Sequence, residues 1–149
     1  DEEEQSELWA SHRCGRRPVL LHAGSLDGRP SAAHSGYHFL PGRPEHNRQV
    51  SVRDGSVEIA DTISGDGEHL LEWFFHLHPD VTAAPLDRSI ELSMDGRAIA
   101  SISFPFGAAA RIERGYWHPG FNTAVPNTLI HIALRASLPF EFITTIDWR

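Results

Sequence analysis

The sequence predicts an all-β fold, an antiparallel β-sandwich that forms one domain over residues 1–149. Strand-like segments recur about every ten residues and are separated by turns rich in Gly, Pro and Asp, a pattern typical of sandwiches and barrels. Two of these turns are Asp-Gly pairs, Asp54-Gly55 and Asp95-Gly96, which suit two-residue hairpins. No segment shows the apolar period of a long amphipathic helix.

The first half of the chain is expected to contain two short strands, a hairpin and one long strand. We expect a first strand over residues 16–23, a turn region over 24–31, and a short strand followed by a loop over 32–44. The hairpin strands are Asn47–Arg53 and Ser56–Ser64. Residues 68–77 form the longest apolar strand candidate. Alternate side chains of this strand share one largely apolar face, and they are His69, Leu71, Trp73, Phe75 and Leu77.

The second half of the chain is expected to continue as strands and loops. Residues 79–87 are predicted to be a loop, and a second hairpin follows over 89–94 and 97–104. A short strand over 109–113 precedes an irregular, aromatic loop over 115–126. The last two predicted strands cover 128–136 and 138–146, because their apolar residues alternate with a period of two.

Composition narrows the classes of partner. The net charge of -7 disfavours nucleic acid, and no apolar run is long enough to span a membrane, so we expect neither partner. All 13 basic residues are arginine, whose guanidinium fork suits carboxylate and sulfate groups. The single cysteine, Cys14, excludes an internal disulfide and lacks a recognisable catalytic partner. The chain starts at Asp1 rather than Met, as expected of a processed chain or a piece of a longer one.

Two histidines at one strand end suggest a metal site, but the sequence lacks the further ligands that such a site needs. His76 and His78 share a face, and such a pair on a strand can chelate zinc, copper or iron. However, Pro79 and Asp80 follow, without the later Glu that a cupin-type site needs, and His69 points to the opposite face from His76. We therefore expect exposed imidazoles at this strand end, no metal and no cofactor.

Asp61 lies on an otherwise apolar strand face, and this position needs an explanation. Val57, Ile59 and Ile63 share that face, so an ionised carboxylate there needs polar partners. The main hypothesis is an aspartate that bonds backbone amides or an arginine and so fixes the neighbouring turn. The alternative is a catalytic carboxylate.

A saccharide-facing edge is the main candidate binding site. His34 and Tyr37 lie on one side of a Gly/Pro loop, and His46 and Arg48 lie on the other. Imidazole, phenol and guanidinium groups together can bind an acidic sugar, and a tyrosine can serve as acid or base in proton abstraction. We therefore take His34, Tyr37 and Arg48 as candidate substrate-binding residues. The alternative is loop packing with exposed polar tips.

Trp117 is the fourth candidate substrate-binding residue. With His118 it could form an edge on which a sugar ring stacks, whereas the alternative is an aromatic plug at the end of the sandwich. The basic cluster of Arg13, Arg16 and Arg17 is interpreted as a solvated edge. No Ser-His-Asp arrangement, phosphate loop or paired-cysteine motif is present.

An ordered series of short motifs resembles the C-terminal β-sandwich of the heparinase II/III-like polysaccharide lyases. The series covers nearly the whole chain, and its order is more specific than any single motif. It consists of Gln5-Ser-Glu-Leu-Trp9 followed by Arg13 and Arg16-Arg17, Ala33-His34-Ser-Gly-Tyr37, His46-Asn-Arg48, Val57-Glu-Ile-Ala-Asp61, Gly65-Asp-Gly67-Glu-His69, Phe75-His76-Leu77-His78-Pro79 and Gly115-Tyr-Trp-His-Pro119.

The resemblance implies an α/α toroid followed by an antiparallel sandwich, in an enzyme that cleaves uronic-acid polysaccharides by β-elimination. In such lyases a base removes the C5 proton, and the catalytic Asn and Tyr lie mainly in the toroid. The sandwich adds a His-x-His-x-Asp stretch and a His-Asn-Thr stretch, and some members bind a structural metal with residues from these regions. Neither stretch is found here, because Arg48 rather than Thr follows His46-Asn47, and that pair lies beyond the Gln5 segment.

This departure leads us to expect an accessory role. The chain would be the later part of the sandwich of a larger lyase, without turnover alone and with no catalytic residue that we can assign. Its partners would be an acidic polysaccharide, such as a glycosaminoglycan, and the upstream toroid of the same protein, in the periplasm or outside a bacterial cell. The alternative is a stand-alone carbohydrate-binding or interaction module.

Overall fold

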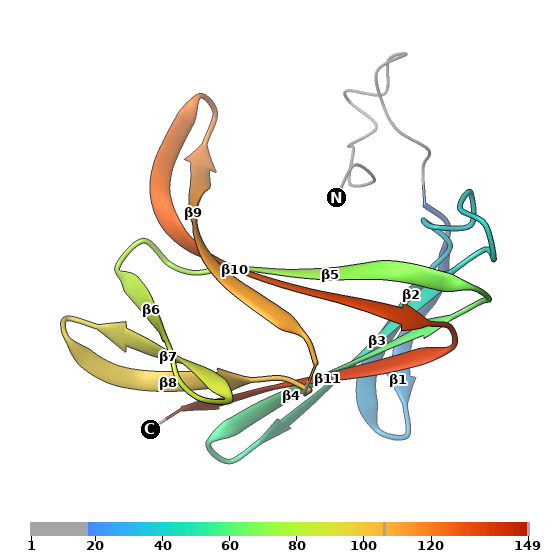
Figure 1. Cartoon of the computed structure of the whole chain (residues 1–149), viewed down its shortest axis with the longest axis horizontal. Coiled ribbons are helices and arrows are strands. Elements are labelled where there is room, and N and C mark those ends of the chain that lie inside the picture. Colours follow the sequence, from blue (N-terminus) through green and yellow to red (C-terminus); the bar gives the residue numbers. More distant parts are fainter. Residues whose placement is uncertain (1–17, 106, 149) are drawn as a thin grey trace. The chain divides into compact units, whose positions relative to one another are not determined.

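Two antiparallel sheets make up the computed structural model, which describes residues 18–105 and 107–148 (Figure 1). The larger sheet has the order β1-β2-β3-β4-β11-β8-β7-β6 and the smaller has the order β5-β10-β9. These described residues contain no helix, so the predicted all-β antiparallel sandwich class is confirmed. The strands are β1 (Leu20–Leu26), β2 (Arg29–His34), β3 (Glu45–Arg53), β4 (Ser56–Ser64), β5 (Glu68–His76), β6 (Val81–Pro85), β7 (Ser89–Met94), β8 (Arg97–Ser103), β9 (Ala109–Gly120), β10 (Thr123–Ser137) and β11 (Phe140–Trp148).

The chain divides into two compact units by its internal contacts. The described part of the first unit comprises residues 18–51, 59–68 and 137–142, and the second comprises the remaining described residues. Strands β3, β4 and β11 each contribute two or more residues to both units, and β5 and β10 each contribute one end residue to the first unit. The sequence-predicted site residues His34, Tyr37, Arg48 and Asp61 belong to the first unit, whereas Trp117 belongs to the second.

The first unit begins with a hairpin where the sequence predicted a turn region. Strands β1 and β2 pair through Leu26 and Arg29, and the turn between them is Asp27-Gly28, with φ angles of 52° and 77°. Residues 24–31 are therefore mostly strand, and the broader turn prediction was wrong. The cause is local, because Asp-Gly tolerates positive φ at both central positions and so closes a tight hairpin here as well.

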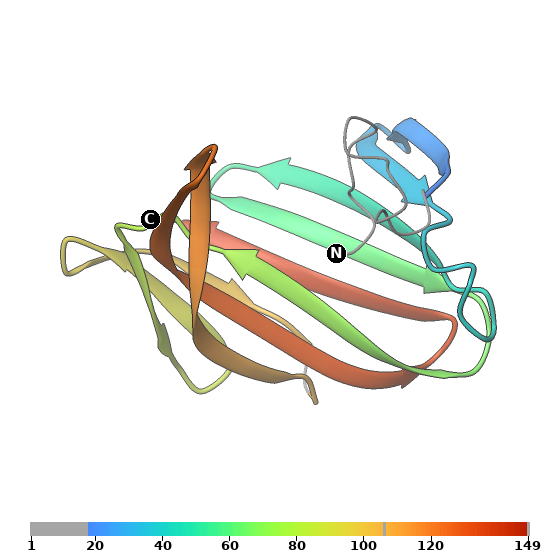
Figure 2. The ribbon, with the colours of Figure 1, turned by 90° about the horizontal axis from the view of Figure 1, so that it is seen from above.

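The two hairpins predicted from Asp-Gly pairs are confirmed. Strands β3 and β4 run side by side and join across Asp54-Gly55, and β7 and β8 join across Asp95-Gly96 (Figure 2). The turns differ in detail, since both Asp95 and Gly96 have positive φ, whereas of the first pair only Gly55 does. Each hairpin fixes which residues face each other across two strands.

The core of the second unit follows the alternation of its strands. Along β5 the buried or half-buried side chains of His69, Leu71, Trp73 and Phe75 alternate with exposed ones, as predicted. Ile130 and Ile132 of β10 are fully buried. Apolar burial of this kind contributes about 25 cal/mol per Å² of area removed from water, so these strands hold the unit together.

Two predicted loops of the second unit are strands. Residues 81–85 form β6, which among the described strands pairs with β7 alone and so is an edge strand, and Pro85 therefore removes no ladder bond from a sheet interior. Residues 115–126, predicted as an irregular aromatic loop, belong to a long hairpin of β9 and β10 with a register shift between Thr123 and Val125. Strand β9 is also an edge strand, which is where Pro119 is tolerated.

A close backbone contact in the first unit fixes the loop between β2 and β3. Asp66 N donates to Gly42 O at 3.1 Å. A side chain on Gly42 would collide with the Asp66 carbonyl, and one on Gly65 would lie 2.8 Å from Gly42 O and 3.0 Å from Pro44 Cα. Gly42 and Gly65 also have positive φ, so both positions require glycine. The contact ties the end of β4 to the segment that enters β3.

Candidate functional site

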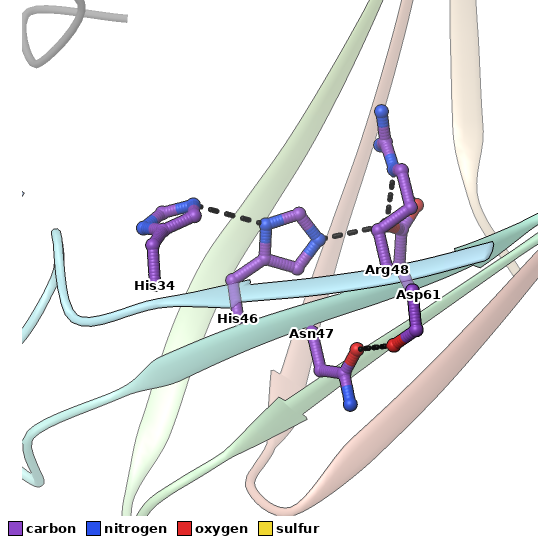
Figure 3. Close-up of polar contacts among 6 residues, drawn as sticks. His34, His46, Asn47, Arg48 and Asp61 are labelled. Carbon is purple, nitrogen blue, oxygen red and sulfur yellow. Dashed lines mark hydrogen bonds and ion pairs between the residues drawn. The ribbon is translucent and has the colours of Figure 1, made fainter. Parts of the chain in front are cut away.

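Three neighbouring strands of the first unit bring the candidate residues together (Figure 3). His34 of β2 lies directly opposite His46 of β3 in the register of the pair. Arg48 is two residues beyond His46, and successive side chains of a strand alternate between faces, so both share one face. Asp61 of β4 lies beside them and completes the cluster of His34, His46, Arg48 and Asp61, called here the Asp61 network.

Asp61 is the centre of this network and is fully buried, with 0% of its side chain exposed. Arg48 binds it through both arms of the guanidinium fork, Nε to Oδ1 at 2.6 Å and Nη2 to Oδ2 at 3.0 Å. His46 Nε2 lies 2.7 Å from Oδ1. A buried carboxylate is stable only when it is paired and hydrogen-bonded, and here both of its oxygens are used.

The two imidazoles extend the network in one direction. Gly36 N donates to His34 Nδ1 at 3.1 Å, so a neutral His34 carries its proton on Nε2. His34 Nε2 lies 3.3 Å from His46 Nδ1, which must then accept, and this places the proton of His46 on Nε2, toward Asp61. The tautomers follow from the hydrogen-bond pattern, and every ring nitrogen in the series has a partner.

The pKa of Asp61 reflects opposing influences. Burial raises it, because the charged form loses water, whereas the hydrogen bonds from His46 and Arg48 and the positive charge of Arg48 lower it. The pKa falls below its ordinary value of 3.8 as the net result. Asp61 is therefore ionised at neutral pH, and it compensates the charge of Arg48.

The predicted saccharide edge is assembled in part. The rings of His34 and Tyr37 have centroids 5.5 Å apart, and His34 joins Arg48 through His46 and Asp61. One edge of the Arg48 guanidinium binds Asp61, while the side chain remains 43% exposed. The main hypothesis for Asp61, an aspartate bonded to an arginine, is confirmed. Sugar binding by His34, Tyr37 and Arg48 stays a prediction.

Trp117 does not belong to this network. It lies on β9 in the second unit, is 45% exposed, and its ring is 5.8 Å from the ring of His78. His118 is engaged within its own hairpin, where Nδ1 donates to Thr123 O at 3.0 Å. Within the described residues the ring of Trp117 thus lies beside that of His78, and sugar binding by Trp117 stays a prediction.

His46 belongs to the Asp61 network but was not among the candidate substrate-binding residues, although the sequence contained a signal for it. A two-residue turn pairs Arg53 with Ser56, and counting back along both strands of an uninterrupted hairpin pairs Arg48 with Asp61. His46 then lies on the same face as Arg48. The predicted hairpin thus already contained the ion pair.

The described residues give no support for a metal site. Among residues 18–105 and 107–148 no group of three or more His, Cys, Asp or Glu side chains is arranged to hold a metal ion. In the Asp61 network both ring nitrogens of His46 and the carboxylate oxygens already bind protein groups. The described part also has no helix long and apolar enough to cross a membrane. Cys14, Arg13, Arg16 and Arg17 lie outside the described residues.

Comparison with known families decides the relationship. The family model described as heparinase II/III-like, C-terminal, matches residues 1–149. The chain belongs to this family. The predicted resemblance to the heparinase II/III-like lyases is therefore confirmed, and it spans the residues that form the Asp61 network. A search of curated proteins found no match.

Solved structures of this family share the fold. A heparinase III gene product superposes with a TM-score of 0.64 at 14% identity, covering 88% of this chain and 21% of that one. The heparan sulfate lyase HepC from Pedobacter heparinus superposes with a TM-score of 0.64 at 11% identity, over the same shares of the two chains. This heparinase II/III-like chain thus spans about a fifth of the length of those structures.

Proposed function

We propose that this chain is the later part of the C-terminal sandwich of a polysaccharide lyase that cleaves uronic-acid polysaccharides by β-elimination. Its role is accessory. It supports an upstream α/α toroid of the same protein and contributes an edge that contacts the acidic glycan. The chain forms a single sandwich domain, and the enzyme works in the periplasm of a bacterium or outside the cell, where such glycans occur.

The burial of Asp61 and its hydrogen bonds to Arg48 and His46 are the observation that supports this proposal. β-Elimination needs a base that reaches the C5 proton of the sugar, within about 3 Å. Asp61 is fully buried, and Arg48 and His46 occupy its oxygens, so this carboxylate cannot contact a substrate. The network instead holds β2, β3 and β4 at the place where the loop carrying Tyr37 leaves β2. These contacts are those of a structural support.

The glycan-contacting edge consists of His34, Tyr37 and Arg48 in this proposal. The exposed part of the Arg48 side chain can offer further N–H groups to a uronate or sulfate, while its inner edge stays on Asp61. Because Asp61 already compensates the arginine charge, this contact serves orientation more than affinity.

Activity measurements on two proteins test the proposal. The isolated chain and the full-length parent are incubated with heparan sulfate, hyaluronan and alginate, and the absorbance of the unsaturated uronate product is followed. The parent should turn over at least one of these glycans, and the isolated chain none. Turnover by the isolated chain would contradict the accessory role. A parent that is inactive on all three and leaves no unsaturated product from other acidic glycans would contradict the lyase assignment.

The second candidate, a carbohydrate-binding module independent of a lyase, is favoured by the exposed ring of Trp117. Exposed aromatic rings commonly stack on sugars or other partners. The two candidates differ in the parent protein, because a module of this kind would bind a glycan without any elimination in the same polypeptide.

A further inference from the structure

A buried amide in the second unit is only half satisfied. Asn127 of β10 is 7% exposed, and its Nδ2 donates to Leu77 O at 2.9 Å. Its Oδ1 is buried and has no hydrogen-bond partner among the described residues. An unpaired buried acceptor is costly, so its position is informative.

Gly115 and His76 show where that oxygen points. Gly115 of β9 lies opposite Asn127 in the strand register. A methyl group on Gly115 would lie 2.6 Å from Asn127 Oδ1 and 3.6 Å from Nδ1 of His76. Asn127 Oδ1 and the exposed imidazole of His76 therefore lie on two sides of the same point above β9. That point is free of side-chain atoms because residue 115 is a glycine.

Trp117 and His78 complete this site on the same face. Trp117 is two residues beyond Gly115 on β9, so the two positions share a face, and its ring contacts that of His78 at 5.8 Å. Asp80 N donates to His78 Nδ1 at 3.3 Å, with the Asp80 carboxylate 3.6 Å from the same nitrogen. His78 Nε2 therefore carries a proton that is available to an acceptor outside the protein.

We propose that this site, formed by His76, His78, Gly115, Trp117 and Asn127, binds a uronic-acid residue of a glycan. The apolar face of the sugar ring stacks on Trp117. His78 Nε2 donates to the carboxylate. The ring of His76 turns its Nδ1–H onto Asn127 Oδ1, which leaves Nε2 to accept a sugar hydroxyl. Asn127 is thus a positioning residue. When the glycan binds, His76 donates to Asn127 Oδ1 the hydrogen bond that this oxygen otherwise lacks.

The donor and acceptor pattern favours this ligand class. A hydroxyl and a carboxylate on one stacked ring match an imidazole acceptor next to an imidazole donor, whereas a neutral sugar leaves the His78 donor without a charged partner. The choice of a uronate rests on the proposed function, but the site itself does not require lyase activity. Glycan binding by this chain and elimination by the parent are therefore separate observations.

Nitrogen-15 NMR titration of the full chain tests the site with two probes, a heparan sulfate tetrasaccharide and cellotetraose. The heparan sulfate probe should shift the side-chain signals of Trp117 and Asn127. Trp117→Ala should weaken its binding about tenfold, which is the usual worth of one stacked ring. Tyr116→Ala is the matched control, because Tyr116 is similarly exposed, at 49%, but lies on the opposite face of β9.

The role of Asn127 has its own readout. Asn127→Ala should weaken binding and abolish the change in the His76 imidazole nitrogen signals that the probe causes in the wild type. Equal losses in Trp117→Ala and Tyr116→Ala, or no binding of either probe, would overturn the site. Tighter binding of cellotetraose would overturn the uronate assignment. An inactive parent with intact heparan sulfate binding would contradict only the lyase proposal.

Discussion

A single carboxylate determines how the polar residues of the first unit are arranged. Asp61 is fully buried, and it is compatible with that burial only because Arg48 and His46 bind its oxygens. His34 then orients His46 through the remaining ring nitrogen. A charged side chain on an otherwise apolar strand face thus becomes the centre of hydrogen bonds that connect β2, β3 and β4.

Removal of Arg48 should expose how much the chain depends on this pair. Arg48→Ala leaves the buried carboxylate with His46 alone, and we expect a loss of about 2–3 kcal/mol in the free energy of unfolding. This is below the roughly 3–5 kcal/mol found when one partner of a fully buried pair is removed, since the Arg48 side chain is 43% exposed. Urea denaturation measures the change. Arg48→Lys should recover part of it, and an Arg48→Ala variant as stable as the wild type would rule out this account.

Acid should weaken the folded state through the same carboxylate. The pKa of Asp61 is lower in the folded chain than its ordinary value of 3.8, so its stabilising contribution is complete above that pH and is lost as the pH falls through the folded pKa. We expect the stability advantage of the wild type over Asp61→Asn to narrow below pH 3.8. Urea denaturation from about pH 7 to about pH 2 measures both curves. Parallel curves would show that Asp61 does not titrate in this way.

At the scale of the elements, tight turns and close backbone contacts set the strand register. Three of the four Asp-Gly pairs of the described chain each close a two-residue hairpin, between β1 and β2, β3 and β4, and β7 and β8, whereas the fourth, Asp66-Gly67, lies between β4 and β5. Gly42 and Gly65 differ from the hairpin glycines, because a Cβ on either would lie under 3.0 Å from another backbone segment, whereas Gly28 and Gly96 have no atom within 4 Å and Gly55 has only Trp148 O at 3.8 Å. The connection between β2 and β3 is therefore held by backbone as well as by the Asp61 network.

Alanine substitutions separate the two roles of glycine. Gly28→Ala introduces a side chain at φ 77° with no atom within 4 Å, so it measures the cost of positive φ alone, about 1 kcal/mol. Gly42→Ala has nearly the same φ, 76°, but collides with the Asp66 carbonyl, and it should cost at least twice as much. Thermal unfolding compares the two variants. Equal losses would mean that the close contact does not restrain the loop.

The sequence predicted some of these strands and missed others, and the difference has physical reasons. Alternation located β5, residues 128–136 of β10 and most of β11, because one face of each is buried. It failed for β6 and for residues 115–120 of β9, since edge strands tolerate Pro and nearly every residue of β9 is exposed. The ion pair of Arg48 and Asp61 was implied by the Asp54-Gly55 hairpin. In contrast, the hydrogen bond from Asn127 to Leu77 O and the close approach of Asn127 to Gly115 join different strands, and no local sequence pattern predicts them.

At the scale of the whole molecule, family membership and the Asp61 network both support the accessory role proposed above. The chain belongs to the heparinase II/III-like family and spans about a fifth of the related structures. In the Asp61 network, the buried carboxylate is satisfied by protein groups. Such a cluster supports a sandwich more readily than it performs chemistry, which is the basis of the accessory role proposed above.

The turnover number of the full-length parent carrying Asp61→Asn tests this central claim most directly. It is measured at a temperature where circular dichroism shows the variant to be folded. A structural role predicts a kcat within about threefold of the wild type, together with a lower melting temperature. Loss of a catalytic base typically costs roughly 100-fold or more. A folded Asp61→Asn enzyme with a kcat reduced to that extent would contradict the account and make Asp61 part of the catalytic machinery.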